Sequence, residues 1–252
     1  MILGIIQARV SSSRLPGKVL KPVLGVPMIL RQIERVQNAK LIDHLVIATS
    51  QDVSDDPLEK ICKDNGLDCF RGSLNDVLDR FYQAAKLYHP DHVVRLTGDC
   101  PLADPKVIDQ VIQFHFDNNY DYSSNTIETT YPDGLDIEIM CFACLEKAWK
   151  EATLSSQREH VTPFIHQQPQ LFKLGSFKNR IDLSHLRWTV DEPADFEVIN
   201  TIYENLYQDG KIFTMEVILS FLQKNSKLMD VNSMYQRNEG YQKSLREDRK
   251  IK

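Results

Sequence analysis

The sequence has none of the features that mark a membrane protein or a disulfide-stabilised secreted protein. No apolar run approaches the ~18–20 residues that a membrane-spanning helix needs, and the first nine residues lack the basic leader of a signal peptide. The five cysteines are an odd number and are scattered between positions 62 and 144, so they do not form a disulfide framework. We therefore expect a cytoplasmic protein with free thiols and no membrane partner.

A strong net charge is also missing. Thirty Lys and Arg residues stand against 35 Asp and Glu residues, and the net charge of −5 provides no global field that would attract a nucleic acid. The apolar fraction of 42% and the charged fraction of 26% are those of a soluble globular chain. With 252 residues, the chain is long enough for one large domain or two small ones. No nucleic-acid partner is expected, and any polyanionic ligand must meet a local basic patch.

Several catalytic motifs are absent as well. The sequence contains neither a Walker loop nor a Gly-x-Gly-x-x-Gly turn, and no Ser or Cys stands in a nucleophile elbow. None of the seven histidines pairs at metal-binding spacing with another ligand. Cys141 and Cys144 have the spacing of a redox or zinc pair, but no second Cys or His pair lies near them in the sequence. Covalent and zinc catalysis therefore have no support.

Apolar periodicity predicts strands that alternate with helices through the first half of the chain. This order is typical of a mostly parallel sheet with helices on both faces. It predicts a three-layer, Rossmann-like α/β sandwich whose ligands bind at the carboxyl ends of the strands. The expected strands are residues 2–8, 44–49, 67–70 and 93–96, and the expected helices are residues 27–38, 55–65, 77–88 with Asn75 as N-cap, and 105–116.

The alternation becomes less regular after residue 120, where we expect a small inserted subdomain over residues 120–177. Beyond it, the sheet is expected to resume at residues 186–190. The last residues, 226–252, are polar and charged, and they predict a solvated or frayed tail. The remaining expected elements are strands at 135–140 and 171–177 and helices at 145–151, 157–167, 193–207 and 214–223.

A basic, hydroxyl-rich loop follows the first strand. Arg9, Arg14 and Lys18 place three positive charges within ten residues, and three consecutive serines add hydrogen-bond donors. Successive amides of a tight loop can form a concave anion site, so the loop is a candidate phosphate site. The alternative is a polar surface loop with ordinary basic residues. The serines are Ser11, Ser12 and Ser13.

Two aspartates stand immediately after predicted strands. Asp99 follows residues 93–96 and a glycine that permits close approach, and Asp191 follows residues 186–190. Carboxylates together with substrate phosphates are the usual ligands of protein-bound Mg²⁺, so the pair suggests a metal and polyphosphate site. Asp99 could instead form a turn, and Asp191 could cap the helix that follows. Asp76 and Arg80 have the spacing of a surface ion pair.

These segments together resemble the sugar-acid cytidylyltransferases, typified by the 3-deoxy-manno-octulosonate and acylneuraminate cytidylyltransferases. The similarity is greatest to the spore coat polysaccharide biosynthesis protein F group. It covers about residues 1–225, and it implies the fold of nucleotide-diphospho-sugar transferases and GT-A enzymes. The similar segments are residues 6–9, 13–18, 25–28, 71–80, 97–101 (Thr-Gly-Asp-Cys-Pro), 133–136, 158–163 and 188–191.

The resemblance implies an enzyme that joins CMP from CTP to the anomeric hydroxyl of a 2-keto sugar acid and releases pyrophosphate, with Mg²⁺ and as a homodimer. Residues 1–225 would form the nucleotidyltransferase domain, with 120–177 as the sugar-binding and dimerisation region. Asp99 and Asp191 would hold the metal, and Arg14, Lys18 and Asp99 would be catalytic. Nucleotide binding would fall to Ala8, Arg9, Ser11, Ser12, Ser13, Arg14, Lys18, Arg71, Ser73, Asp76, Thr97 and Gly98, and acceptor binding to Asp133, Asp136, Arg158 and His160, with Arg158 as the cation for the sugar carboxylate.

The sequence departs from the better-known members in two places. They have Gln-Gly-Asp-Glu-Pro or a similar string where this chain has Thr-Gly-Asp-Cys-Pro at 97–101, and their sugar-contacting segments have no counterpart here. The acceptor therefore stays open. The alternatives are a nucleotidyltransferase for a sugar 1-phosphate or another phosphorylated alcohol, a GT-A glycosyltransferase, whose usual Asp-x-Asp motif is missing, and a non-catalytic nucleotide-binding protein.

Overall fold

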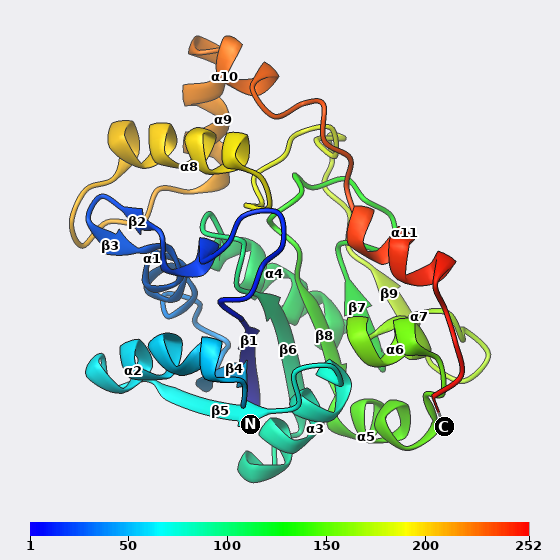
Figure 1. Ribbon diagram of the computed structural model, residues 1–252. Helices are drawn as coiled ribbons and strands as arrows, with labels where there is room; N and C mark the ends of the chain where they lie inside the picture. Colours follow the sequence, from blue (N-terminus) through cyan, green and yellow to red (C-terminus); the bar gives the residue numbers. More distant parts are fainter. Residues whose placement is uncertain (252) are drawn as a thin grey trace.

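A seven-stranded sheet with the strand order β5-β4-β1-β6-β8-β7-β9 forms the centre of the computed structural model (Figure 1). The structure describes residues 1–251, and Lys252, at the end of the predicted tail, lies outside them. A two-stranded sheet of β2 and β3 stands apart. The strands are β1 (Ile2–Gln7), β2 (Pro22–Val23), β3 (Val26–Pro27), β4 (His44–Ser50), β5 (Asp68–Gly72), β6 (His92–Thr97), β7 (Tyr122–Ser124), β8 (Glu138–Cys141) and β9 (Leu174–Ser176).

Eleven α-helices and two short 3₁₀ helices surround the sheet in residues 1–251, and none of them is long and apolar enough to cross a membrane. The 3₁₀ helices are η1 (Lys18–Leu20) and η2 (Val53–Asp55). The α-helices are α1 (Met28–Val36), α2 (Asp56–Asp64), α3 (Val77–Tyr88), α4 (Pro105–Asp117), α5 (Phe142–Glu151), α6 (Ser155–His160), α7 (Pro163–His166), α8 (Pro193–Leu206), α9 (Met215–Lys224), α10 (Lys227–Asp230) and α11 (Glu239–Arg246).

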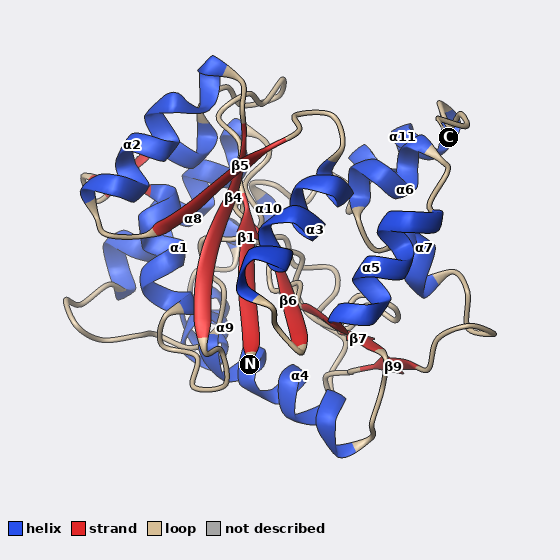
Figure 2. Ribbon diagram, turned by 90° about the horizontal axis from the view of Figure 1, so that it is seen from below, coloured by secondary structure: helices blue, strands red, loops and turns tan. Residues whose placement is uncertain are grey.

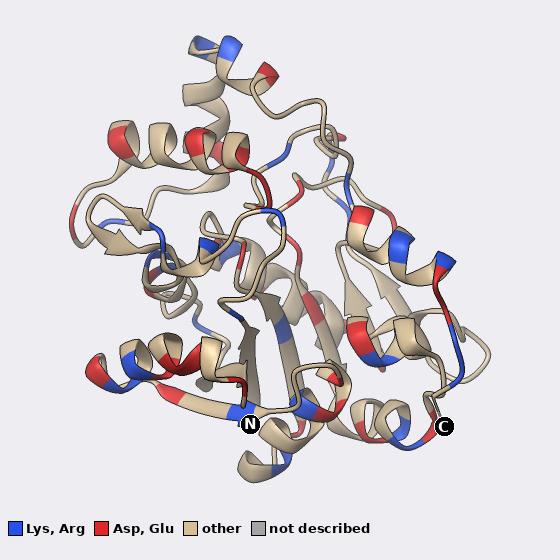
Figure 3. Ribbon diagram, in the orientation of Figure 1, with Lys and Arg blue, Asp and Glu red and all other residues tan. Residues whose placement is uncertain are grey.

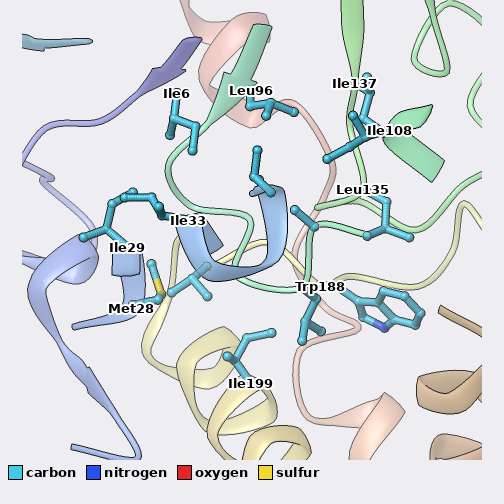
Figure 4. Packing of buried hydrophobic residues seen from close by; sticks show 14 of the residues in the cluster. Ile6, Met28, Ile29, Ile33, Leu96, Ile108, Leu135, Ile137, Trp188 and Ile199 are labelled. Carbon is cyan, nitrogen blue, oxygen red and sulfur yellow. The ribbon is translucent and has the colours of Figure 1, made fainter. Parts of the chain in front are cut away.

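The helices cover both faces of the sheet, which confirms the predicted three-layer sandwich. Side chains alternate across a strand, so Ile5 of β1 packs with α3, α5 and α7 on one face, while Ile6 packs with α1, α4, α8 and α9 on the other. Figure 2 shows the strands between these two groups of helices. Figure 4 shows from close by the cluster on the Ile6 face of the sheet. Ile6 and Leu96 from the sheet, Ile33 from α1 and Ile199 from α8 surround a common interior there. Burial on both faces explains the nearly continuous apolar strands.

The directions of the strands determine at which edge of the sheet a ligand site can form. β1 pairs in parallel with β4 and with β6, as in the registers Ile5↔Val46 and Ile5↔Arg95. β8 runs antiparallel to both of its neighbours, β6 and β7. The carboxyl ends of β1, β4 and β6 therefore lie at one edge, which carries the loops after these strands. The region 120–177 supplies β7, β8 and β9 to the same sheet, and its helices α5, α6 and α7 lie between β8 and β9 in the chain.

Three local expectations were wrong. The N-cap of α3 is Asp76, not Asn75, because the Asp76 carboxylate accepts a hydrogen bond from the amide of Asp79. The helix predicted at 157–167 is interrupted by Val161, whose φ of 71° breaks the helical path before Pro163 starts α7. Residues 186–190 are not a strand: they lie as a buried loop that makes one isolated bridge, between Asp133 and Arg187.

The expectation of a solvated or frayed tail was right on exposure and wrong on fraying, because most of residues 227–251 are exposed but the segment is folded. Residues 227–251 contain α10 and α11, and α11 lies beside α6 (Figure 1). The Asp248 carboxylate accepts hydrogen bonds from the Ser155 hydroxyl at 3.0 Å and from the amide of Ser156 at 3.0 Å. An isolated antiparallel bridge joins Leu154 to Lys250. The polar residues that suggested a free tail are therefore partners for other polar groups.

Candidate active site

Three chain segments meet at the carboxyl ends of β1 and β6. The amide of Gly98 donates to the carbonyl of Gln7 at 2.8 Å, and the amide of Val190 donates to the carbonyl of Asp99 at 2.8 Å. A Cβ atom on Gly98 would lie 2.7 Å from the Cβ of Ala8, so only glycine permits this approach. The loop after β1, the loop after β6 and residues 186–191 are thus held against one another.

This junction brings Lys18, Asp99 and Asp191 together. The Nζ of Lys18 lies 2.9 Å from Oδ2 of Asp99 and 2.8 Å from Oδ1 of Asp191. The Lys18 side chain is only 11% exposed. Burial works against its charge, but the two carboxylates outweigh burial and raise the pKa of the ammonium. Burial would likewise raise the pKa of Asp99, yet the Lys18 charge lowers it to about 2. Lys18 and Asp99 are therefore both ionised at neutral pH.

The Asp191 carboxylate has two further cationic partners. The Nη2 of Arg14 lies 2.9 Å from its Oδ1, and the Nη2 of Arg187 lies 3.3 Å from its Oδ2. Arg187 is held in turn by the buried Asp195, at 2.8 Å. The N-cap of α8 is Glu192, so Asp191 does not have the capping role that the sequence left open. Figure 3 shows basic residues of the first loop beside acidic residues at the start of α8.

The buried carboxylate of Asp55 anchors the basic loop after β1. The amide of Val10 donates to Oδ1 of this fully buried carboxylate at 2.6 Å, and the amide of Ser50 at the end of β4 donates to Oδ2 at 3.1 Å. At the other end, the amide of Gly17 donates to the carbonyl of Val10, and Gly17 adopts a φ of 68°. The loop is therefore closed on itself, with its serines and basic residues carried on a fixed backbone.

A chamber of about 150 Å³, the small chamber, lies beneath this loop. It gathers seven of the residues predicted to bind a nucleotide, together with Asp99. Arg80 and Val77, from the start of α3, complete the wall. The predicted residues that line it are Ala8, Arg9, Ser11, Ser12, Lys18, Thr97 and Gly98, whereas Ser13, Arg14, Arg71, Ser73 and Asp76 do not.

Arg80 is a wall residue that the sequence did not identify as functional. It is 2% exposed, its Nη1 donates to the carbonyl of Ser73 at 3.2 Å, and its Nε has no hydrogen-bond partner among the described residues. Burial and the nearby charge of Arg9 lower the pKa of Arg80 to about 10. A buried guanidinium without a carboxylate contact is costly. Arg80 therefore gives the small chamber a cationic wall with a donor left for an anion.

The structure gives other partners to three predicted site residues. Arg158 is buried, and its Nε donates to both oxygens of Asp76 at 3.0 Å, so neither the cation nor the carboxylate reaches a chamber. Arg71 pairs with Asp56 at 2.7 Å and with Glu59 at 2.6 Å, on the side of α2. The spacing suggested a surface ion pair between Asp76 and Arg80. The Asp76 carboxylate instead caps α3 and contacts Arg158.

A larger chamber of about 380 Å³ adjoins the small one, since Gln7, Thr97 and Asp99 line both. We call it the large chamber. Three of the four predicted acceptor residues line its wall, namely Asp133, Asp136 and His160, and Asp191 lies there as well. The fourth, Arg158, does not.

The carboxylates of Asp133 and Asp136 in the large chamber are paired with arginine side chains. Asp133 accepts a hydrogen bond from Arg187 at 3.0 Å, and Asp136 is paired with Arg237. Burial and the neighbouring Asp136 raise the pKa of Asp133 to about 7, although Arg237 and Arg187 lower it. Burial lowers the pKa of His160 to about 4, so its imidazole is neutral at pH 7. This wall therefore offers neutral hydrogen-bonding groups beside paired charges.

The C-terminal segment closes the large chamber. Gln236, Asn238, Glu239, Gly240 and Tyr241 line it, although the polar composition of this segment predicted only a tail. The segment is held by the contact of Arg237 with Asp136 and by a 2.9 Å hydrogen bond between His160 and Ser244. Only these long-range contacts reveal its role.

The cysteine pair lies elsewhere, at the start of α5. The Sγ atoms of Cys141 and Cys144 and a carboxylate oxygen of Asp121 lie within 4.8 Å of one another. None of the three lines either chamber. All five cysteines are free thiols in the structure.

Known proteins share the sequence pattern and the fold of this chain. Residues 3–243 match the family described as cytidylyltransferase. The chain is 36% identical over 224 residues to the spore coat polysaccharide biosynthesis protein SpsF of Bacillus subtilis, covering 86% of this chain and 92% of that one. It is 30% identical over 225 residues to 3-deoxy-manno-octulosonate cytidylyltransferase of Chlamydia trachomatis, covering 82% and 86%. A solved cytidylyltransferase from Leptospira borgpetersenii superposes with a TM-score of 0.87 at 33% identity, covering 93% of this chain and 99% of that one.

Proposed function

The chain belongs to the cytidylyltransferase family and is a nucleotidyltransferase, and we propose that it transfers CMP from CTP to the anomeric hydroxyl of a 2-keto sugar acid. Pyrophosphate is the second product, and the CMP-sugar serves surface polysaccharide or glycan biosynthesis. The observation that carries this proposal is the contact of Lys18 with both Asp99 and Asp191, at the point where the two chambers adjoin.

The two chambers divide the substrates between them. The small chamber carries hydroxyls and the cations Arg9, Lys18 and Arg80, and in the proposal it binds the triphosphate. The large chamber takes the acceptor. Asp99 lines both, so the α-phosphorus would lie beside it, with the acceptor hydroxyl on one side and the departing pyrophosphate on the other.

The reaction needs positioning and charge neutralisation rather than a covalent intermediate. The acceptor oxygen forms a bond to the α-phosphorus while the bond from that phosphorus to the bridging oxygen of pyrophosphate breaks. Lys18 and Arg14 offset the negative charge that grows on the leaving group. The raised pKa of Lys18 keeps its ammonium charged throughout the neutral range.

The carboxylates of Asp99 and Asp191 fit a divalent cation. Both come within hydrogen-bond distance of one ammonium, so their oxygens converge on a place where positive charge is already held. Carboxylate oxygens combined with substrate phosphates are the ligand set that Mg²⁺ prefers. When bound there, Mg²⁺ would polarise the phosphate and neutralise part of its charge.

The choice of acceptor is supported by the relatives. The Chlamydia relative is a 3-deoxy-manno-octulosonate cytidylyltransferase and the Bacillus relative is a polysaccharide biosynthesis protein. The hydroxyl, imidazole and carboxylate groups in the large chamber suit a polyhydroxylated acceptor.

Family resemblance also implies a cytoplasmic homodimer. Sedimentation of the purified chain tests whether it is a dimer.

The test is a pyrophosphate-release screen of the four nucleoside triphosphates with Mg²⁺ against 2-keto sugar acids and sugar 1-phosphates. We expect product only with CTP and a keto acid, and a loss of about 10²–10³-fold in Asp99→Asn. Asp64→Asn, an exposed residue paired with Lys60 on α2, is the matched control and should keep full activity. Turnover with a sugar 1-phosphate alone would overturn the acceptor. CTP binding without product from any acceptor would overturn the whole proposal.

A further inference from the structure

The large chamber contains one guanidinium that the family motifs did not single out. We propose that Arg95 of β6 binds the carboxylate of the acceptor. The proposal rests on the function proposed above and adds the group that recognises the acid. Among the described residues, Arg95 is the one Lys or Arg side chain that lines this chamber.

The hydrogen bonds of Arg95 leave one nitrogen of its guanidinium, Nη2, without a partner among the described residues. Its Nε donates to Oε1 of Gln7 at 3.1 Å, and its Nη1 contacts Oε2 of Glu138. The side chain is 13% exposed and borders the chamber. A carboxylate oxygen of the ligand can therefore accept a charge-assisted hydrogen bond from Nη2.

Glu138 is a positioning residue for this guanidinium. It lies opposite Arg95 in the register of β6 and β8. Its other oxygen accepts hydrogen bonds from the hydroxyl of Tyr122 at 2.5 Å and from that of Thr162 at 2.6 Å. These donors stabilise the carboxylate and fix its direction, so Glu138 holds Arg95 rather than competing for the space in front of it. Gln7 holds the guanidinium from the opposite side.

The place of Arg95 along β6 matches the reaction. Arg95, Thr97 and Asp99 follow one another at every second residue, and all three line the large chamber. With the carboxylate at Arg95, the anomeric hydroxyl on the adjoining carbon would face Asp99, and the rest of the sugar would extend into the remainder of the chamber. In a 2-keto acid the carboxylate is bonded to the anomeric carbon, so its anchor must lie near the reacting hydroxyl.

The other arginines near the chamber contact carboxylates and, unlike Arg95, do not line its wall. Arg158 contacts Asp76, and Arg237 contacts Asp136. Arg187 contacts Asp133 and Asp195. His160 and His166, which also face this part of the chamber, are neutral at pH 7 because burial lowers the pKa of each. They can donate or accept hydrogen bonds to the sugar but cannot supply the positive charge.

The test compares an accepted 2-keto sugar acid with its carboxamide, which has the same shape without the charge. The variant is the double substitution Arg95→Met with Glu138→Gln, because Arg95→Met alone would leave Glu138 buried without its cation. Arg95→Lys is the second variant, which keeps the charge but loses the guanidinium and its Nη2 donor. Arg31→Met is the matched control, since Arg31 is a buried arginine paired with Glu34 on α1, outside both chambers. Melting temperature and CTP KM report on folding and on the small chamber.

In the wild-type enzyme, kcat/KM should favour the acid over the amide by about 10–100-fold. The double variant should lose this preference through a higher acceptor KM while its CTP KM stays unchanged, and Arg95→Lys should keep part of it. Arg31→Met should keep all of it. A double variant that folds and still prefers the acid would overturn the assignment of Arg95 and leave the proposed function in place. A wild-type enzyme that transfers CMP to no acid would overturn the proposed function, and this assignment with it.

Discussion

Asp99 and Asp191, which come from widely separated parts of the sequence, hold the same Lys18 ammonium at 2.9 Å and 2.8 Å. This contact is made possible by backbone hydrogen bonds that join the loops carrying the two acids, such as the one from Val190 to Asp99. A shared cation between two carboxylates defines where a divalent metal and a triphosphate would meet. The ionised state of Lys18 and Asp99 follows from their contact.

Arg80 should contribute more to CTP binding than to stability. Its buried guanidinium has an unpaired Nε beside Arg9, and this arrangement costs free energy in the empty protein. We expect Arg80→Met to raise the CTP KM by about 10–100-fold, the value of a charge-assisted hydrogen bond of about 1.5–3 kcal/mol. The melting temperature without nucleotide should stay the same or rise. Steady-state kinetics and calorimetry check the two effects, and a stability loss with an unchanged CTP KM would give Arg80 a purely structural role.

The close approach at Gly134 should be intolerant of a side chain. Its φ is +105°, and a Cβ there would lie 2.5 Å from the amide nitrogen of Thr189, in the segment that leads to Asp191. We expect Gly134→Ala to lower the free energy of unfolding by about 2–4 kcal/mol, from backbone strain and overlap together. Gly25 is the matched control, because its φ is +75° but nothing lies within 4 Å of the added atom.

Gly25→Ala should therefore cost only the backbone strain, about 1–2 kcal/mol. Urea unfolding of both variants gives the difference. If Gly134→Ala and Gly25→Ala lower the free energy of unfolding equally, residues 133–135 do not lie against residues 188–189 as described.

His160 should make the protein less stable as the pH falls. Burial lowers its pKa to about 4 in the folded chain, whereas an unfolded histidine has a pKa near ~6.5. Between these two values the unfolded chain binds a proton that the folded chain does not, so stability is full above ~6.5 and falls toward pH 4. At pH 5 this single group accounts for at most about 2 kcal/mol.

His160→Gln should lose less stability than the wild type between pH 7 and pH 5, as measured by urea unfolding at each pH. His185→Gln, at an exposed position, is the control and should follow the wild-type profile. A His160→Gln profile parallel to the wild type would contradict the burial of this imidazole.

The sequence predicts those parts of the fold that depend on local periodicity. The strands β1, β4, β5 and β6 and the helices between them lie close to the expected residues, because alternating apolar segments of these lengths have few other solutions. Residues 186–190 were misjudged because Trp188 and its neighbours are buried through their side chains, while their backbone makes only one bridge. Apolar content indicates burial but does not distinguish a strand from a buried loop.

For the site, the sequence identifies chemistry better than partners. The basic loop and Asp99 could be singled out because they follow the strands β1 and β6, whereas Asp191 was singled out through a predicted strand that is a buried loop. The pairing of Arg158 with Asp76 could not, because it joins segments far apart in the chain. The same pairing removes Asp76 from Arg80 and leaves Arg80 free to face the small chamber. Long-range ion pairs of this kind become visible only in the folded chain.

Calorimetric titration of Mn²⁺ without nucleotide tests the central claim, the shared site of Asp99 and Asp191. Lys18→Met removes the cation that competes for the two carboxylates, so this variant should bind Mn²⁺ at least about tenfold more tightly than the wild type, although its transfer activity is lost. Adding Asp99→Asn to Lys18→Met should abolish the gain. A Lys18→Met variant that binds Mn²⁺ no more tightly than the wild type, or a gain that survives the loss of Asp99, would contradict the account.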